Sequence, residues 1–262
     1  MYKMSIVITD VFGGGIFSLF HQALETLLHH PRADTLTRFK IRISDRHFIR
    51  NKEMFDDFFK DNPETCDMVI EQIDVHHRPT RYLKIHHHAE MQRIKRICRL
   101  NPICPSIVSE VDRYASLFGI NENSLAVHVR MTDMNTIHAN DFGIVTHETY
   151  SMMIDQMLQS HPNIDNIYIT SDNTESIHML QARYSDRYRI TYVTDSYRRE
   201  KEDSENCNFQ RYAINVLPEF HLRAFTELLI ASRCSYFIYR ISDYSNFCIL
   251  YSDTIQAILD VN

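Results

Sequence analysis

The stretch that decides the fold is SLAVHVRMTD, residues 124–133. Its first part, residues 124–129, is an apolar run with few turn formers, which predicts a buried strand. Strands usually stop at Gly, Pro or Asn, yet this run ends in a polar cluster that includes Arg130 and Asp133. The charge therefore lies at the carboxyl end of a predicted strand, where open parallel sheets bind their ligands.

Downstream of this strand the pattern becomes regular. Further apolar runs predict strands, and helical periodicity between them predicts helices. Strands alternating with helices are typical of a parallel, doubly wound α/β sheet. The strands are expected at 166–172, 189–195 and 236–240, and the helices near 146–158, at 174–184 and 219–232, and after Asp243.

The first part of the chain is less regular. A strand is expected at 4–10, followed by a Gly-rich loop and a helix with apolar residues at helical spacing. Short apolar pieces at 38–44 and 67–75 predict further strands, and the basic segment 78–99 is expected to be helical in its second half. A helix opened by Pro105 and closed by Gly119 follows, with Val108, Val111, Ala115 and Leu117 expected on its inner side.

Two prolines near 101–106 mark the predicted domain boundary. We expect two α/β lobes, a short and irregular N-terminal lobe with the Gly-rich loop at 1–105 and a regular C-terminal lobe at 106–262. With 262 residues and 44% hydrophobic residues, the chain is long enough for two lobes with a sizeable core.

Composition excludes several classes of function. A net charge of −6 argues against nucleic-acid binding, which normally shows a basic excess. No apolar run approaches the length of a membrane span, and the apolar run at the N-terminus is too short for a secretory signal. The cysteines lack C-x-x-C spacing, and the chain has no N-x-S/T sequon. Together these features predict a soluble, cytoplasmic protein with free thiols.

The strand ends supply the first candidate site residues. Arg130 can bind a phosphate or carboxylate through a two-pronged contact. Asp172, at the end of the next strand, can accept a hydrogen bond from a base or a sugar hydroxyl. Two structural alternatives stay open: Asp172 and its neighbours cap the following helix, and His128 and Arg130 take part in a structural salt bridge at the strand end.

Other motifs carry less information. The loop with Gly13, Gly14 and Gly15 allows a ligand to approach the backbone, but it lacks the Lys of a P-loop, and a tight turn explains it equally well. The histidine runs at 76–77 and 86–88 lack the spacing of a zinc site, so we expect no native metal. The basic residues of 93–99 are more typical of a solvated helix face than of a binding patch. A G-x-S-x-G nucleophile elbow is absent.

Four motifs, in order along the chain, resemble one family. HVRMTD (128–133) resembles the H-x-R-x-T-D motif of the fucosyltransferase superfamily, which includes the α-1,6-fucosyltransferases, the rhizobial Nod-factor enzymes and, more distantly, the protein O-fucosyltransferases. GGGIFSLFHQAL (13–24) is similar to its Gly-rich loop and helix. NIYITSDN (166–173) and the block at 227–251 are similar to its later strand motifs. The resemblance covers about 106–251 and the Gly-rich loop, whereas 30–100 matches nothing.

The resemblance implies an α/β fold of the GT-B type, with two Rossmann-like lobes and parallel sheets. The lobe at 1–105 would then be the acceptor-side lobe, and the lobe at 106–262 would bind the nucleotide sugar. It implies a metal-independent, inverting glycosyltransferase that needs no cofactor beyond a GDP- or UDP-linked sugar (fucose, xylose or rhamnose) and that modifies a glycan acceptor. It also implies roles for individual residues. Arg130 would clamp the donor diphosphate, His128 and Glu227 would border the nucleobase, Asp172 would shape the donor pocket, and Ser245 and Asn246 would bind phosphate oxygens.

The sequence also departs from the family. The Lys and Glu that follow the Arg motif in the α-1,6 enzymes are absent from TDMNTIHANDFG (132–143), so a catalytically silent nucleotide- or sugar-binding protein stays the alternative. Glu227 stands where the family often has Asp, which leaves the nucleobase of the donor open. An inverting transfer needs a group that takes the acceptor's proton. Asp74 and Asp10 are the first candidates for this base, ahead of Asp133, Asp141 and His138.

Overall fold

The computed structural model describes residues 2–8, 16–31, 33–43, 59, 68–71, 91–132, 135, 143–196, 198 and 218–261. The chain forms two compact units. Unit 1 comprises 1–110, 208–222 and 242–251, and unit 2 comprises 111–207, 223–241 and 252–262. The domain boundary expected at residue 105 stays a prediction.

Unit 1 contains a small parallel sheet. Its strands are β1 (Tyr2–Ile8), β2 (Leu36–Ile43) and β3 (Met68–Glu71), in the order β2-β1-β3. This confirms the three strands expected in the first part of the chain. Among the described residues, the helical elements that lie entirely in this unit are α1 (Ile16–His29), the 3-10 helix η1 (Ala33–Thr35), α3 (Met91–Cys98) and α10 (Asp243–Tyr251).

The helices of unit 1 pack through aromatic and apolar side chains. On α1, Phe20, Leu24 and Leu27 are buried, as their helical spacing predicts. Phe20 also contacts Phe59 and Phe247. The basic face of α3 makes structural contacts, since its arginines donate to the backbone or pair with a carboxylate: Arg93 with Asp34, Arg96 with the carbonyl of Ala33, and Arg99, just after the helix, with the carbonyl of Leu250.

Unit 2 contains the parallel sheet that the sequence pattern predicts. The strand order is β6-β5-β4-β7-β8, which places residues 124–129 at the centre. All neighbouring strands are parallel, so their carboxyl ends meet at one edge. The strands are β4 (Ser124–Val129), β5 (Asn166–Ser171), β6 (Arg189–Thr191), β7 (Tyr236–Tyr239) and β8 (Ala257–Asp260). The sequence pattern did not predict β8.

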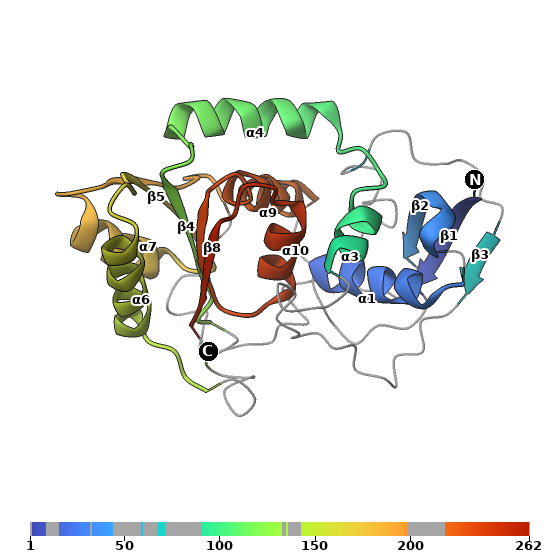
Figure 1. The fold of residues 1–262 in the computed structure, drawn as a ribbon, viewed down its shortest axis with the longest axis horizontal. Coiled ribbons are helices and arrows are strands. Elements are labelled where there is room, and N and C mark those ends of the chain that lie inside the picture. The colour runs from blue at the N-terminus through green and yellow to red at the C-terminus, as the bar shows by residue number, and fades with distance from the viewer. Residues whose placement is uncertain are drawn as a thin grey trace. The chain divides into compact units, whose positions relative to one another are not determined.

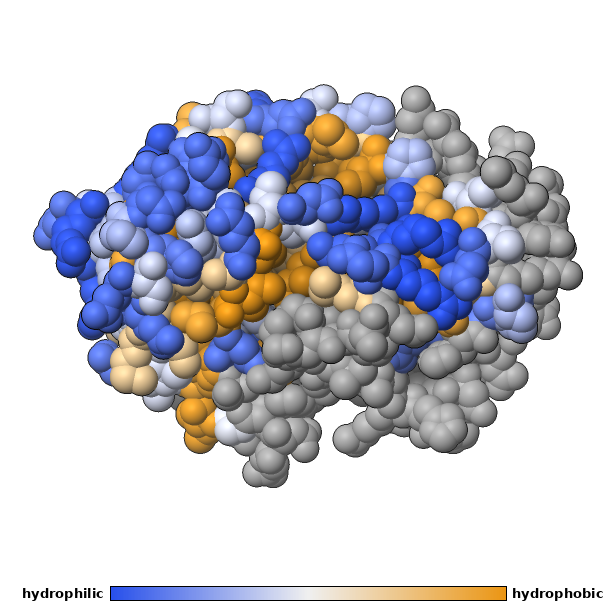
Figure 2. Space-filling model, viewed as in Figure 1, coloured by the Kyte–Doolittle hydropathy of each residue, from blue (hydrophilic) through white to orange (hydrophobic). Residues whose placement is uncertain are grey.

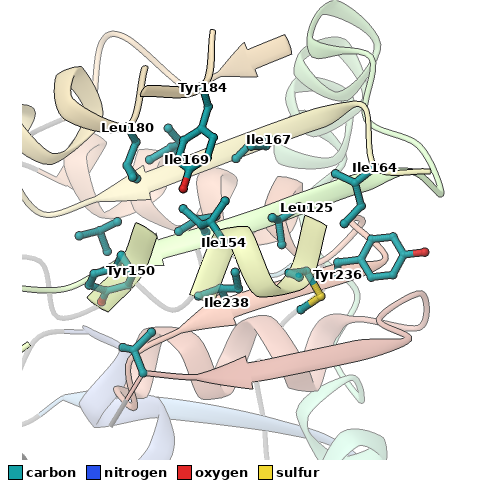
Figure 3. Packing of buried hydrophobic residues seen from close by; sticks show 14 of the residues in the cluster. Leu125, Tyr150, Ile154, Ile164, Ile167, Ile169, Leu180, Tyr184, Tyr236 and Ile238 are labelled. Carbon is teal, nitrogen blue, oxygen red and sulfur yellow. The ribbon is translucent and has the colours of Figure 1, made fainter. Parts of the chain in front are cut away.

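One face of this sheet packs against α6 (His147–Ser160) and α7 (Thr174–Tyr184). Alternate residues of β4 and β5 point into this core, as Figure 3 shows for Leu125, Ile167 and Ile169. Tyr150 and Ile154 of α6 lie against them. Hydrophilic residues predominate on the outer side of this part of the unit (left in Figure 2), as expected for amphipathic helices.

The other face of the sheet packs against α4 (Pro105–Phe118) and α9 (Pro218–Ala231). The rings of Phe118 and Tyr168 lie 5.9 Å apart, which joins α4 to β5. The helix α4 ends as predicted at Gly119, whose φ of 67° favours glycine. Its inner side was only partly predicted: Val111 and Ala115 are buried, but Val108 and Leu117 point to solvent because Ile107 takes the inner position instead.

The predicted α/β fold class with parallel sheets is confirmed (Figure 1). In the described part of the chain, no helix is long and apolar enough to cross a membrane. The cysteines that the structure describes, Cys98, Cys104, Cys234 and Cys248, form no disulfide bond with one another.

Candidate donor-binding site

The site is built around the peptide of Arg130, directly after the central strand β4. Its amide N–H donates to the hydroxyl of Tyr150 at 3.0 Å, and its carbonyl accepts from Arg240 at 3.3 Å. The side chain of Arg130 is 28% exposed, and its Nε lies 3.7 Å from the Oδ2 of Asp172. The backbone is therefore fixed on both sides, while the Arg130 side chain stays partly exposed.

Asp172 fixes the segment that follows Arg130. Its carboxylate accepts hydrogen bonds from the amides of Met131 (3.3 Å) and Thr132 (3.1 Å) and from the Thr132 hydroxyl (2.6 Å). The cap of α7 is the neighbour Asn173, whose side chain accepts from the Ser176 amide at 2.8 Å. Asp172 thus shapes the edge of the sheet beside Arg130, and the capping role belongs to Asn173.

His128 lies on the α4–α9 face of the sheet, because the side chains of β4 alternate. Its Nδ1 shares a hydrogen bond of 3.0 Å with the hydroxyl of Thr170 on β5. Burial, together with the nearby Arg130 cation, lowers the pKa of His128 to about 3. The imidazole is therefore neutral near pH 7, which suits it to hydrogen bonding with a neutral ring rather than to binding a phosphate.

Glu227 lies on α9 and forms a buried ion pair. Its Oε1 accepts from Nη2 of Arg198 at 2.8 Å, and both side chains are almost fully buried. Burial raises the pKa of Glu227 to about 7, while the Arg198 cation opposes that shift. The hydroxyl of Tyr168 on β5 lies 3.5 Å from the backbone carbonyl of Glu227, so the pair lies over the same face of the sheet as His128.

Ser245 and Asn246 lie in the first turn of α10, in unit 1. The Ser245 hydroxyl accepts from the Ser242 amide at 2.9 Å, and the Ser242 hydroxyl accepts from the Ser245 amide at 3.1 Å, which caps the helix. Asn246 is 1% exposed. Among the described residues, its side-chain amide is an orphan, with no hydrogen-bond partner for either its oxygen or its nitrogen. Buried side-chain amides without a partner are uncommon in folded proteins, so this one needs an explanation.

Several predicted site residues lie outside the described residues. They are the Gly-rich loop (Gly13, Gly14, Gly15) and the candidate bases Asp10, Asp74, Asp133, His138 and Asp141. The histidine runs lie outside as well. Among the residues that the structure does describe, no group of three or more His, Cys, Asp or Glu side chains is arranged to hold a metal ion.

The structure also reveals residues of the site that the sequence analysis missed, namely Tyr150, Arg198 and Arg240. Arg240 had a signal in the sequence, since YFIYR repeats the pattern of LAVHVR, an apolar strand that ends in arginine. Tyr150 and Arg198 had none, because each meets its partner through a contact between residues far apart in the chain.

No protein-family model matches this sequence, and no curated protein sequence matches it either. Solved structures do resemble it. The chain is similar to the fucosyltransferase NodZ from Bradyrhizobium, with a TM-score of 0.57 and 12% identity over 98% of this chain and 95% of that one. It is also similar to NodZ α-1,6-fucosyltransferase co-crystallised with GDP (TM-score 0.56, 12% identity, 98% and 94% coverage).

A second enzyme shares the fold. POFUT1 in complex with GDP-fucose matches with a TM-score of 0.51 and 10% identity, over 98% of this chain and 97% of that one. Identities this low establish the fold alone. The chain therefore has the α/β fold of the fucosyltransferases, as the sequence motifs led us to expect.

Proposed function

We propose that this chain is a glycosyltransferase that transfers a sugar from a nucleotide diphosphate donor to a glycan acceptor. The observation that carries the proposal is Arg130, a partly exposed arginine side chain on a fixed peptide at the carboxyl end of the central strand. The proteins that share this fold supply the donor class, since their structures hold GDP or GDP-fucose.

The chemistry of transfer needs such a cation. When the sugar carbon is attacked, the bond to the diphosphate breaks and negative charge develops on the leaving phosphate. A guanidinium fixed in place stabilises that charge without reorganising during the reaction. Because Arg130 can supply this stabilisation itself, the proposal includes a reaction that needs no metal ion, and it includes inversion, which the family resemblance implies.

The remaining residues have assigned roles in this proposal. Neutral His128 borders the nucleobase. Glu227 also contacts the nucleobase, once donor binding has rearranged the ion pair between Glu227 and Arg198. The Gly-rich loop, Ser245 and Asn246 supply contacts to phosphate oxygens, and the orphaned amide of Asn246 supports this role. Asp10, Asp74 and Asp133 stay the candidates for the base that deprotonates the acceptor. The cytoplasmic location expected from the sequence also remains part of the proposal.

The donor is identified with a panel. The protein is incubated with GDP-fucose, other GDP-sugars, UDP-xylose and dTDP-rhamnose, and release of the nucleoside diphosphate is measured beside thermal shift. We expect donors with one particular nucleobase to stabilise the protein against heat and also to be turned over. Failure of every donor to bind would contradict the proposal.

The silent binding protein is the second candidate function. It is favoured by the segment 132–143, which lacks the Lys and Glu of the α-1,6 enzymes. It predicts stabilisation by a nucleotide sugar without hydrolysis or transfer to any glycan in an acceptor panel. The same experiment therefore separates the two functions.

A further inference from the structure

A second arginine, Arg240, lies at the carboxyl end of β7, the strand beside β4. Its side chain is fully buried. Among the described residues, its guanidinium donates to the carbonyl of Arg130 at 3.3 Å, the side-chain oxygen of Asn135 at 2.6 Å and the carbonyl of Gly143 at 2.6 Å. The planar guanidinium presents its donors in a fixed fork, so one side chain holds all three acceptors at defined positions.

Asn135 makes these contacts part of one closed structure. Its side-chain nitrogen donates to the carbonyl of Val145 at 2.7 Å, and its side-chain oxygen accepts from the Val145 amide at 3.0 Å. Its own amide donates to the carbonyl of Met131 at 3.1 Å. Asn135 therefore links the residues that follow Arg130 to the residues that precede α6. Arg240, at the end of β7, donates hydrogen bonds to both of these segments.

We propose that Arg240 is a positioning residue for Arg130 in sugar transfer, an inference that rests on the proposed function. The peptide of Arg130 is held by Tyr150 on its amide side and by Arg240 on its carbonyl side. Without Arg240 the carbonyl side loses its donor and the guanidinium of Arg130 leaves its working position. Displacements of about 1 Å in a catalytic group can lower turnover by about a hundredfold.

The test combines Arg240 and Arg130 variants with GDP-fucose as the probe. Arg240→Lys keeps the charge but loses the fork, and we expect GDP release to slow by about tenfold or more, with a smaller change in the Kd for GDP. Arg233→Met is the matched control, because Arg233 pairs with Asp112 at the surface of the same unit. In an Arg130→Ala background, Arg240→Lys should slow the reaction no further. Equal slowing in both backgrounds would overturn the proposal.

A second measurement does not depend on any donor. Hydrogen exchange at the amides of Arg130, Met131 and Thr132 reports whether Arg240 holds this segment. We expect Arg240→Lys to speed exchange there while the core amides of β4 stay protected, and Arg233→Met to leave it unchanged. Unchanged exchange would overturn the proposal, even where GDP-fucose is not turned over. If exchange speeds up but no donor binds the unmodified protein, the failure belongs to the proposed function.

Discussion

Two neighbouring strand ends carry the same residue in very different environments. Arg130 follows β4, is 28% exposed and lies 3.7 Å from the Oδ2 of Asp172. Arg240 follows β7, is fully buried and donates to the backbone and to an amide side chain. In the sequence both are an arginine after an apolar run.

The difference shows that two arginines at the same edge of a parallel sheet can have different roles. A partly accessible guanidinium can bind an anion, whereas a fully buried one with several oxygen acceptors can only hold structure. Removing a buried charged donor leaves its acceptors unsatisfied, which is costly. Substitution of Arg130 should therefore impair anion binding, whereas substitution of Arg240 should disturb the local structure.

The largest expected effect tests this division at Arg130. Arg130→Ala should leave the fold intact and slow transfer by roughly a hundredfold to a thousandfold, or about 3–4 kcal/mol of transition-state stabilisation. Arg130→Lys should rescue poorly, since a point charge cannot make the two-pronged contact. Initial rates of GDP release and far-UV circular dichroism check both. Near-normal turnover in Arg130→Ala would remove the contrast with Arg240.

The comparison also assumes that Arg130 stabilises the leaving group and that another residue takes the acceptor's proton. Separate Asn substitutions at Asp10, Asp74, Asp133 and Asp141 identify that residue. The true base should lose turnover by about a hundredfold or more while its donor affinity is retained. Rates and calorimetric donor binding are measured side by side. Full activity in all four variants places the base elsewhere, with His138 the next residue to change.

His21 is another buried cation and, unlike Arg240, it can lose its charge within an accessible pH range. In unit 1, His21 lies 2.9 Å from Asp243 and 3.6 Å from Glu25. Burial favours the neutral ring, but the hydrogen bonds and charges of both carboxylates outweigh it and raise the pKa of His21 to about 9. This stability is present below pH 6.5, the ordinary pKa, and is lost as the pH rises towards 9.

Urea unfolding should therefore show a decline of about 2–3 kcal/mol across that window, and His21→Gln should flatten it. His178→Gln, which alters an exposed histidine on α7, is the control and should keep the decline. A slope that survives in His21→Gln would assign it to other groups.

A smaller effect is expected on the amide side of Arg130. Tyr150→Phe removes the acceptor at 3.0 Å, so stability should fall by about 1 kcal/mol and turnover should fall as well. Tyr184→Phe is matched to it, because Tyr184 lies in the same core and its hydroxyl donates to the Ser151 carbonyl. Equal turnover in the two variants would show that the Arg130 peptide needs no support from Tyr150.

The smallest expected effect is none at all. If Arg130 neutralises the leaving diphosphate, EDTA should leave the rate of GDP release unchanged. Loss of turnover that an added divalent ion restores would transfer this role from Arg130 to a metal, and would turn attention to the histidine runs at 76–77 and 86–88.

Much of the fold was predictable because it depends on local pattern. The apolar runs of β4, β5 and β7 and the helical spacing on α1 are determined within a few neighbouring residues. The strand β8 was missed because Ala257–Asp260 is short and half-buried, and it is a strand only through its pairing with β7. Val108 and Leu117 were misplaced on α4 because the sheet selects the face, and the apolar spacing alone allows more than one.

For the site, too, local sequence pattern predicts less than the tertiary contacts determine. The sequence by itself determined which residues stand at the ends of the strands: His128, Arg130 and Asp172 follow from an apolar run that ends in polar groups. Only the tertiary structure decided that Asp172 holds the Thr132 segment, that Glu227 pairs with Arg198, and that Arg240 is buried beside Arg130. The physical reason is that a strand sets the direction of its own side chains, whereas burial and hydrogen-bond partners come from elements far away in the chain.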